Sequence, residues 1–205
     1  MEAYGDKLLL AMPLDLGYQE VITRAVGSSR YRITVKTEGG HSWFASDKTN
    51  SIAVLARIIN KIYDIPMGTS PKTTYNAGVI SGGRSVNTVA PEASLLLDIR
   101  SENYQSLEEL KARIMGIIEE EKGKDRIIEV TNIGDRPCGD GKVSPVVRNI
   151  IDHVNRITGI SPKEIAASTD ANIPLSRGIP AFVIGAAIGG KEHSMEEYIE
   201  IDSVE

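Results

Sequence analysis

The chain of 205 residues is long enough for one large domain, or for one domain and part of a second. Hydrophobic residues make up 41% of it and charged residues 25%, which is typical of a soluble globular protein. The net charge of −5 and the lack of a basic run argue against nucleic acid as a partner, and no apolar run is long enough to make a membrane a partner. The single cysteine, Cys138, excludes an intrachain disulfide and favours a reducing, cytoplasmic location.

Two short strands are expected near the start of the chain. Residues 7–11 form an apolar run that leads into a proline, and residues 20–26 form a second run. Gly27, Ser28 and Ser29 then interrupt the pattern, so we expect a domain boundary there and assign residues 1–28 to a first segment of one domain.

From residue 30 onward the hydrophobic pattern becomes regular. Apolar and polar residues alternate over 31–35, which predicts a half-buried strand. Residues 50–65 have a helical period, with an apolar face made of Ile52, Leu55, Ile59 and Ile62. Residues 73–80 and 93–99 predict two further strands. A capping box at Ser106–Glu109 opens a second helix, and residues 127–133 predict a last strand.

These elements follow one another in the order β-α-β-β-α-β. This is the order of a ferredoxin-like fold, an antiparallel sheet with two helices on one face. We therefore expect a ferredoxin-like domain over residues 29–134. One sheet face and an edge strand are left uncovered, so we expect this domain to pair with a second copy of itself.

The remaining part, residues 135–205, has the pattern of an α/β layer. A linker over 134–141 precedes a helix at 145–158, a polar loop at 168–172 and a buried strand at 181–184. The two ends together supply few residues for a complete three-layer domain. The predicted fold class is thus α/β (α+β), with a ferredoxin-like domain inserted into an incomplete α/β domain.

Few residues are candidates for metal chemistry. A zinc site normally takes three or four ligands, and the chain has only three histidines, His41, His153 and His193. His41 follows a glycine pair between a strand and a helix, where it is either an ordinary loop residue or one that reaches a ligand. His193, after a glycine-rich loop, and Asp15, at a strand end, are possible metal ligands, although such an aspartate often only forms a turn. His153 lies on a predicted helix and is assigned to the surface.

Polar groups near strand ends complete the candidates. Arg100 closes an apolar strand, where its guanidinium either clasps a carboxylate or lies in solvent. Asn87, Ser168 and Thr169 are further polar groups in such positions.

An ordered set of motifs resembles one known family. The motifs are, in chain order, Gly27–Val35, Gly39–Trp43, Gly82-Gly83 with Ser85–Pro91, Leu97–Arg100, Gly134–Pro137, Ser168–Asn172, Gly178–Pro180 and His193–Glu197. Together they make the chain similar to the co-catalytic zinc amidohydrolases and exopeptidases. This family includes glutamate carboxypeptidase, peptidase T, acetylornithine deacetylase, succinyl-diaminopimelate desuccinylase and aminoacylase.

The resemblance implies roles for the two parts of the fold and for the histidines. The ferredoxin-like domain matches the family's lid, or dimerisation, domain, and the two ends match parts of its catalytic domain. His193 matches a zinc ligand, and Asp15 falls near the position of an acidic ligand. His41 matches the histidine that a dimer partner contributes to the active site, where it stabilises the oxyanion.

The resemblance also implies how a substrate is held. Asn87 and Arg100 match lid residues that hold the substrate's carbonyl and carboxylate, and Ser168 and Thr169 match a substrate-contact loop. The implied substrate is a small peptide or an N-acyl amino acid. The implied cofactor is zinc, two ions in the complete enzymes, with cobalt or manganese as alternatives.

Some of the family's residues have no counterpart in this chain. These are the first zinc histidine, the bridging aspartate and the Glu-Glu pair that holds the general base. We therefore expect the C-terminal portion of such an enzyme, which does not fully bind the metals, is inactive alone, and depends on an N-terminal catalytic segment.

Two other interpretations remain open at this point. In the first, the chain is a non-catalytic dimerisation or binding module that keeps the lid fold. In the second, it is an unrelated ferredoxin-like regulatory domain. The second of these does not explain the His193 segment.

Overall fold

The computed structural model describes residues 10–14, 17, 19–139, 143–191 and 194–204. The chain separates into two compact units. The central unit consists of Ser28–Asp135, and the terminal unit is built from the two ends, residues 1–27 and 136–205.

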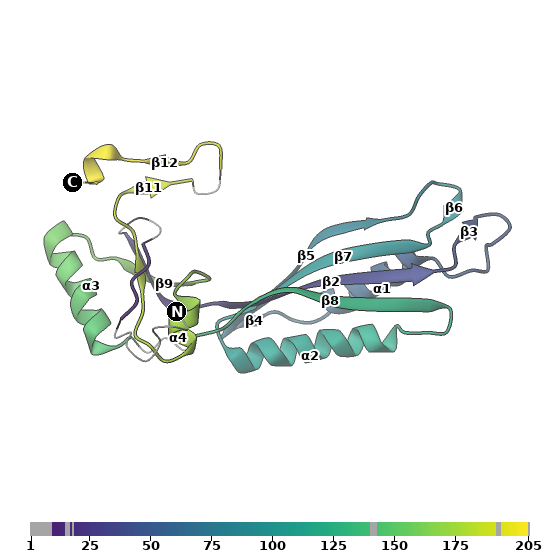
Figure 1. Ribbon diagram of the computed structural model, residues 1–205, viewed down its shortest axis with the longest axis horizontal. Coiled ribbons are helices and arrows are strands. Elements are labelled where there is room, and N and C mark those ends of the chain that lie inside the picture. Colours follow the sequence, from purple (N-terminus) through teal and green to yellow (C-terminus); the bar gives the residue numbers. More distant parts are fainter. Residues whose placement is uncertain (1–9, 15–16, 18, 140–142, 192–193, 205) are drawn as a thin grey trace, which may run out of the picture. The chain divides into compact units, whose positions relative to one another are not determined.

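The central unit is a five-stranded sheet with two helices on one face (Figure 1). The strand order across the sheet is β4-β5-β7-β2-β8. The strands are β2 (Gly27–Thr37), β4 (Gly68–Thr69), β5 (Lys72–Gly82), β7 (Glu92–Ser101) and β8 (Arg126–Arg136), and the helices are α1 (Ser51–Tyr63) and α2 (Tyr104–Glu120). The order β2-α1-β5-β7-α2-β8, with the short β4 added at the edge, confirms the predicted ferredoxin-like fold.

The inner strands of this sheet run antiparallel. β5 and β7 pair in this way. At one end of β2 the Arg30 guanidinium lies 3.1 Å from the Asp98 carboxylate, and at the other end the Thr37 amide donates to the Pro91 carbonyl at 2.8 Å. The start of β2 therefore lies beside the end of β7, and the end of β2 beside the start of β7.

The hydrophobic effect explains why both helices lie on the same face. Alternate residues of β7, from Ala93 to Ser101, are buried, and α1 and α2 both pack against this strand. The predicted apolar face of α1 is partly wrong. Val54, Leu55, Ile58 and Ile62 are buried, whereas Ile52 is exposed beside Gly83 at the edge of the sheet.

Asparagine side chains cap both helices of the central unit. Asn50 accepts the backbone amide of Ile52 at 2.9 Å at the start of α1. The predicted capping box at Ser106 is wrong, because Asn103 caps α2 and accepts the Ser106 amide at 3.0 Å. Asparagine is as strong an N-cap as serine, so the helix begins three residues earlier.

Two strands extend further than the sequence pattern predicted. β2 already begins at Gly27, with only Val26 between it and the preceding strand. Gly27 serves close packing instead of a turn, since a Cβ there would lie 2.3 Å from the Cys138 Sγ. Likewise, β8 continues to Arg136 through the start of the predicted linker.

The terminal unit has a three-stranded sheet with a helix on each face. Its strands are β1 (Glu20–Ala25), β9 (Lys163–Ala167) and β10 (Val183–Ile184), and its helices are α3 (Pro145–Thr158) and α4 (Asn172–Ser176). β1 is central, parallel to β9 and antiparallel to β10. Val21 packs in the cluster that contains α3, and Ile22 packs in the cluster that contains α4. Successive residues of a strand point to opposite faces, so the sheet is covered on both sides.

The outer parts of the terminal unit are short elements. β11 (Gly189–Gly190) and β12 (Tyr198–Ile199) pair antiparallel and lead into a 3₁₀ helix, η2 (Ile201–Ser203). The predicted strand at 7–11 falls mostly outside the described residues, but Ala11 forms a parallel bridge with Ala181. β9 was not predicted, because its first residues, Lys163 and Glu164, do not have an apolar pattern.

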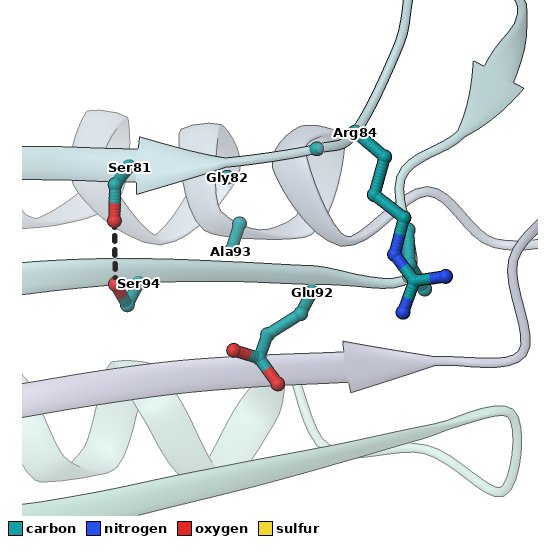
Figure 2. A pocket seen from close by; sticks show the side chains of 8 residues that line it. Ser81, Gly82, Arg84, Glu92, Ala93 and Ser94 are labelled. Atoms are coloured by element: carbon teal, nitrogen blue, oxygen red, sulfur yellow. Dashed lines mark hydrogen bonds between the residues drawn. The ribbon is translucent and has the colours of Figure 1, made fainter.

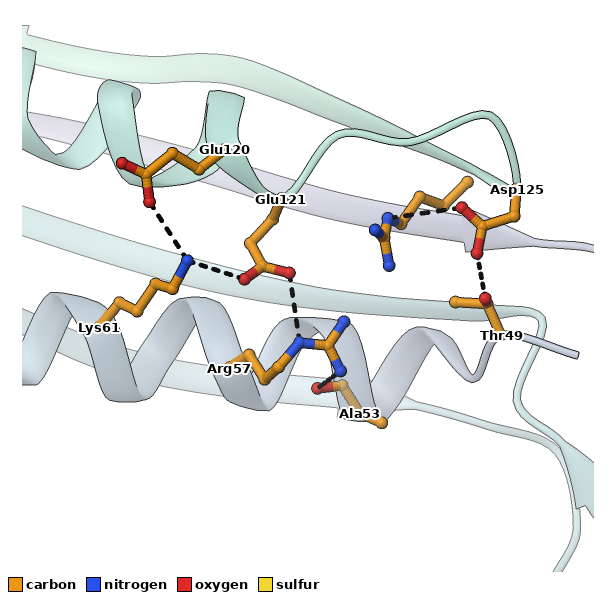
Figure 3. Close-up of polar contacts among 8 residues, drawn as sticks. Thr49, Ala53, Arg57, Lys61, Glu120, Glu121 and Asp125 are labelled. Atoms are coloured by element: carbon orange, nitrogen blue, oxygen red, sulfur yellow. Dashed lines mark hydrogen bonds and ion pairs between the residues drawn. The ribbon is translucent and has the colours of Figure 1, made fainter. Parts of the chain in front are cut away.

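An ion-pair network joins the two helices of the central unit (Figure 3). The Glu121 carboxylate at the end of α2 contacts Arg57 Nε at 3.2 Å and Lys61 Nζ at 3.0 Å on α1. Glu121 is only 7% exposed. Burial by itself raises the pKa of Glu121, but the hydrogen bonds from Lys61 and Arg57 outweigh it and leave the pKa below its ordinary value of 4.5.

We predict that Glu121→Gln destabilises the central unit by about 1–3 kcal/mol, because it removes two charge-assisted hydrogen bonds at a buried position. The matched control is Glu120→Gln, which removes a carboxylate that also contacts Lys61 but is 68% exposed. Urea unfolding measures both variants. Equal losses of stability in the two variants would contradict the prediction.

The Glu121 carboxylate also makes the stability of the central unit depend on pH. The folded-state pKa of Glu121 lies below its unfolded value, so its contribution to stability is fully present above about pH 4.5 and is lost as the pH falls through the folded-state pKa. The difference in unfolding free energy between wild type and Glu121→Gln should therefore shrink on acidification over this range.

Candidate functional site

Two short strands bring His41 and Asn87 together at one end of the central sheet. β3 (Gly40–His41) pairs antiparallel with β6 (Thr88–Val89), with His41 opposite Thr88. The Ser42 amide donates to the Asn87 carbonyl at 2.9 Å. We call residues 39–45 and 84–89, which form this end, the tip.

Glycine makes the tip possible. Gly39 and Gly40 have φ angles of +74° and +138°, which residues with a Cβ rarely adopt. These two residues turn the chain out of β2 and into β3, and His41 follows at once.

One ring nitrogen of His41 is already engaged. The Trp43 amide donates to Nδ1 at 3.3 Å, and the Phe44 ring lies 5.2 Å from the imidazole. A neutral imidazole whose Nδ1 accepts a hydrogen bond carries its proton on Nε2. His41 therefore offers an N–H donor at Nε2.

The carboxamide of Asn87 is held in a similar way. Its Oδ1 accepts a hydrogen bond from the Ser85 hydroxyl at 2.8 Å. Within the described residues, nothing accepts from its Nδ2. His41 and Asn87 thus each present an N–H donor, and the acceptor atom of each already takes a hydrogen bond, which suits a ligand oxygen that only accepts hydrogen bonds.

Large apolar side chains surround these donors. Trp43 and Phe44 are 80% and 82% exposed, and Val86 on the facing segment is fully exposed. Exposed apolar groups gathered in one place indicate a contact surface.

A hollow of about 380 Å³ lies close to the tip, where β5 ends and β7 begins (Figure 2). Ser81 and Ser94 share a hydrogen bond of 2.9 Å in it, and Arg84 and Glu92 border it. None of the site residues predicted from the sequence lines it.

Arg100 lies on β7, away from the tip. Its Nε donates to Asp98 Oδ2 at 2.6 Å, and the other Asp98 oxygen contacts Arg30. Asp98 therefore holds the guanidinium of Arg100 along the open face of the sheet.

Ser168 and Thr169 belong to the terminal unit, in the loop that follows β9. The Thr169 amide donates to Asn172 Oδ1 at 2.8 Å, and its hydroxyl accepts from the Ala171 amide. The Ser168 Oγ is buried and has no hydrogen-bond partner among the described residues. A buried hydroxyl without a partner is uncommon and marks Ser168 as a position where a ligand could supply one.

The two predicted metal ligands, Asp15 and His193, lie outside the described residues. Within the described ranges, no three His, Cys, Asp or Glu side chains gather to hold a metal ion. The described part of the chain therefore does not fit a zinc ion. No described helix is long and apolar enough to span a bilayer.

Sequence reasoning missed Ser85, Thr88 and Asn172. The signal for the first was present in the spacing of Ser85 and Asn87, since a serine often bonds to a group two residues away. Asn172 is 1% exposed, and its Nδ2 donates to the carbonyls of Val26 and Pro137 at 2.8 and 3.0 Å. It therefore ties together the two chain segments that join the units, which lie far apart in sequence.

Comparisons with known proteins agree with this fold. A family model described as the M20 peptidase dimerisation domain matches residues 23–126. Succinyl-diaminopimelate desuccinylase of Nitrosospira multiformis is 25% identical over 188 residues, which are 87% of this chain and 48% of that protein.

Solved structures are similar over almost the whole chain. Aminopeptidase PepT of Bacillus cereus superposes with a TM-score of 0.76 at 22% identity, over 96% of this chain and 53% of that one. A tripeptidase of Staphylococcus aureus gives a TM-score of 0.76 at 20% identity, with the same coverage of 96% and 53%. The chain thus spans about half the length of these relatives.

We predict that Asn172→Ala lowers the stability of the terminal unit by about 1–3 kcal/mol, because it removes the donor of two hydrogen bonds to part-buried carbonyls. Asn172→Asp should be similarly harmful, since a carboxylate cannot donate to them. Ser176→Ala is the control, because it removes one exposed side-chain bond from the same helix. Thermal unfolding compares the three, and a neutral Asn172→Ala would show that the amide does not tie the segments together.

Proposed function

The chain belongs to the M20 family through its peptidase dimerisation domain, and from this premise we propose that it is the lid-bearing portion of a zinc-dependent metallohydrolase. The proposed reaction is hydrolysis of an amide bond in a small peptide or an N-acyl amino acid. The similarity to a desuccinylase and to peptidases supports this reaction class.

The paired donors at the tip are the observation that carries the proposal. Nε2 of His41 and Nδ2 of Asn87 both donate hydrogen bonds. They therefore suit a carbonyl oxygen that becomes an oxyanion when water attacks. A single donor of this kind is typically worth about 3–4 kcal/mol of transition-state stabilisation. On this proposal His41 acts in the active site of a dimer partner, and Asn87 holds the substrate carbonyl.

The other site residues have supporting parts in the proposal. Asp98 occupies Nε of Arg100, so a substrate carboxylate would be bound by the remaining guanidinium nitrogens. Ser168 and Thr169 contact substrate, with the unpartnered Ser168 hydroxyl as the donor. Asp15 and His193 are proposed metal ligands that need further ligands from outside the described residues.

An open sheet edge supports a homodimer. Beyond its short pairing with β4, strand β5 has no neighbouring strand on its outer side among the described residues, and Val79 and Ile80 on it are 54% and 57% exposed. From Thr73 to Gly82 this strand has no charged residue. The other edge strand, β8, includes Arg126, Glu129, Asp135 and Arg136, and charges of this kind protect an edge against pairing. We therefore propose that two copies join through β5, with Ile52 of α1 alongside, about a two-fold axis.

A non-catalytic dimerisation module is the second candidate. The absence from the sequence of counterparts to the family's first zinc histidine, bridging aspartate and Glu-Glu pair favours it. It shares the dimer with the first candidate and differs from it in the absence of any hydrolytic activity.

We predict that Val79→Asp raises the dimer dissociation constant at least tenfold, which corresponds to about 1.4 kcal/mol, because it places a charge on the pairing edge. Ile127→Asp is the matched control, since Ile127 is similarly exposed on β8. Sedimentation equilibrium measures both. A monomeric wild type at high concentration, or dissociation by the β8 variant instead, would show that the interface is placed wrongly.

We also predict that the chain alone, supplied with zinc or cobalt, does not hydrolyse dipeptides or N-acetyl and N-succinyl amino acids. The reason is that the chain has no counterpart of the family's general base or of its first zinc histidine and bridging aspartate. Appreciable turnover that disappears in His193→Ala would refute this.

A second experiment supplies the missing metal ligands from another protein. The chain is co-expressed with the N-terminal half of the Nitrosospira multiformis desuccinylase, and N-succinyl substrates are assayed. The proposal expects turnover that falls about 10²–10³-fold in His41→Ala. Failure to hydrolyse any substrate, with dimerisation intact, favours the non-catalytic module.

A further inference from the structure

The turn that holds Asn87 contains three side chains linked by hydrogen bonds. The Ser85 Oγ lies 2.8 Å from Asn87 Oδ1 and 2.7 Å from Thr88 Oγ1. All three residues belong to the tip and lie within four consecutive positions, on the segment that faces His41.

Counting protons gives this chain a direction. The Ser85 hydroxyl has one proton, and it donates that proton to Asn87 Oδ1. In the Ser85–Thr88 pair the donor must then be Thr88. The hydrogen bonds therefore run from Thr88 to Ser85 to Asn87, and bonds in such a series strengthen one another.

We propose that Ser85 is a positioning residue, which orients the Asn87 carboxamide so that Nδ2 faces the ligand and Oδ1 does not. This rests on the proposed role of Asn87 as a donor to the substrate oxygen. Without a partner on Oδ1, the carboxamide could turn by 180° and present an acceptor to an oxygen that also accepts.

The shape of the turn does not account for this hydroxyl. The backbone already closes the turn, because the Thr88 amide donates to the Ser85 carbonyl at 3.2 Å. Ser85 is also exposed, so its side chain fills no space in the core. What the hydroxyl adds is its bonds to the side chains of Asn87 and Thr88.

Thr88 connects the two donors of the tip. It stands opposite His41 in the β3–β6 pair, and its hydroxyl begins the chain that ends on Asn87. The backbone pairing that places His41 therefore also places the group that orients Asn87.

Nuclear magnetic resonance on the ¹⁵N-labelled full chain tests the proposal. The Asn87 side-chain signals are identified by their loss in Asn87→Ala. In the wild type we expect an order parameter for Nδ2 of roughly 0.85, the value of a rigid N–H group, together with rapid exchange of its hydrogens with water, since Nδ2 faces outward. In Ser85→Ala the order parameter should fall below roughly 0.6.

Two variants separate orientation from general damage. Ser85→Thr keeps the hydroxyl and should restore the rigid signal. Ser81→Ala removes a comparable exposed hydroxyl pair with Ser94 and should leave Asn87 unchanged. Retained backbone signals of His41 and Thr88 show that the β3–β6 pair is still formed.

Two results would overturn the proposal. One is an Asn87 side chain that is equally rigid in Ser85→Ala. The other is an Nδ2 hydrogen that exchanges slowly in the wild type, which would mean that Nδ2 bonds to Ser85 and Oδ1 faces outward. Neither reading involves turnover, so this result is independent of whether the chain takes part in amide hydrolysis.

Discussion

The antiparallel pairing of β2 and β7 determines which loops of the central unit can meet. Because the end of β2 lies beside the start of β7, the segment after β2 and the segment before β7 emerge at the same end of the sheet. The first segment carries His41 and the second carries Asn87, and these residues are 46 positions apart in the sequence. With a parallel arrangement these segments would leave at opposite ends, and the two donors could not face one ligand.

The same pairing explains how the helices and the open edge are distributed. β7 is buried on one face by both helices, so its hydrophobic alternation holds α1 and α2 on that side. Apart from the short β4, the strand order β4-β5-β7-β2-β8 leaves β5 and β8 at the two edges of the sheet. Of the two, β5 lacks charges along its exposed part, so the fold itself separates a protected edge from one suited to pairing.

Hydrophobic periodicity was sufficient to predict the ferredoxin-like order, because long strands and helices with one buried face give strong signals. It failed where other forces decide. Gly27 looked like a break, yet it is a glycine because Cys138 packs against the backbone there. β9 has too little apolar pattern to be recognised, and it forms because β1 offers it a parallel edge. Ile52 has the right spacing for a buried face, but the sheet ends before it can cover that residue.

The tip shows a second limit of sequence reasoning. A resemblance to a family points to His41 and Asn87, but whether each offers a donor or an acceptor depends on which of their atoms are already bonded. The Trp43 amide decides this for His41, and the Ser85 hydroxyl decides it for Asn87. Trp43 and Ser85 each lie two positions from the residue that they bond, so both roles depend on the local backbone path, which Gly39 and Gly40 turn in the case of His41. An imidazole and a carboxamide can each serve as donor or acceptor, so the two residues suit an accepting oxygen only through such local bonds. These two donors suit a ligand oxygen on which negative charge develops, and the metal chemistry of the proposed reaction can then reside on other segments.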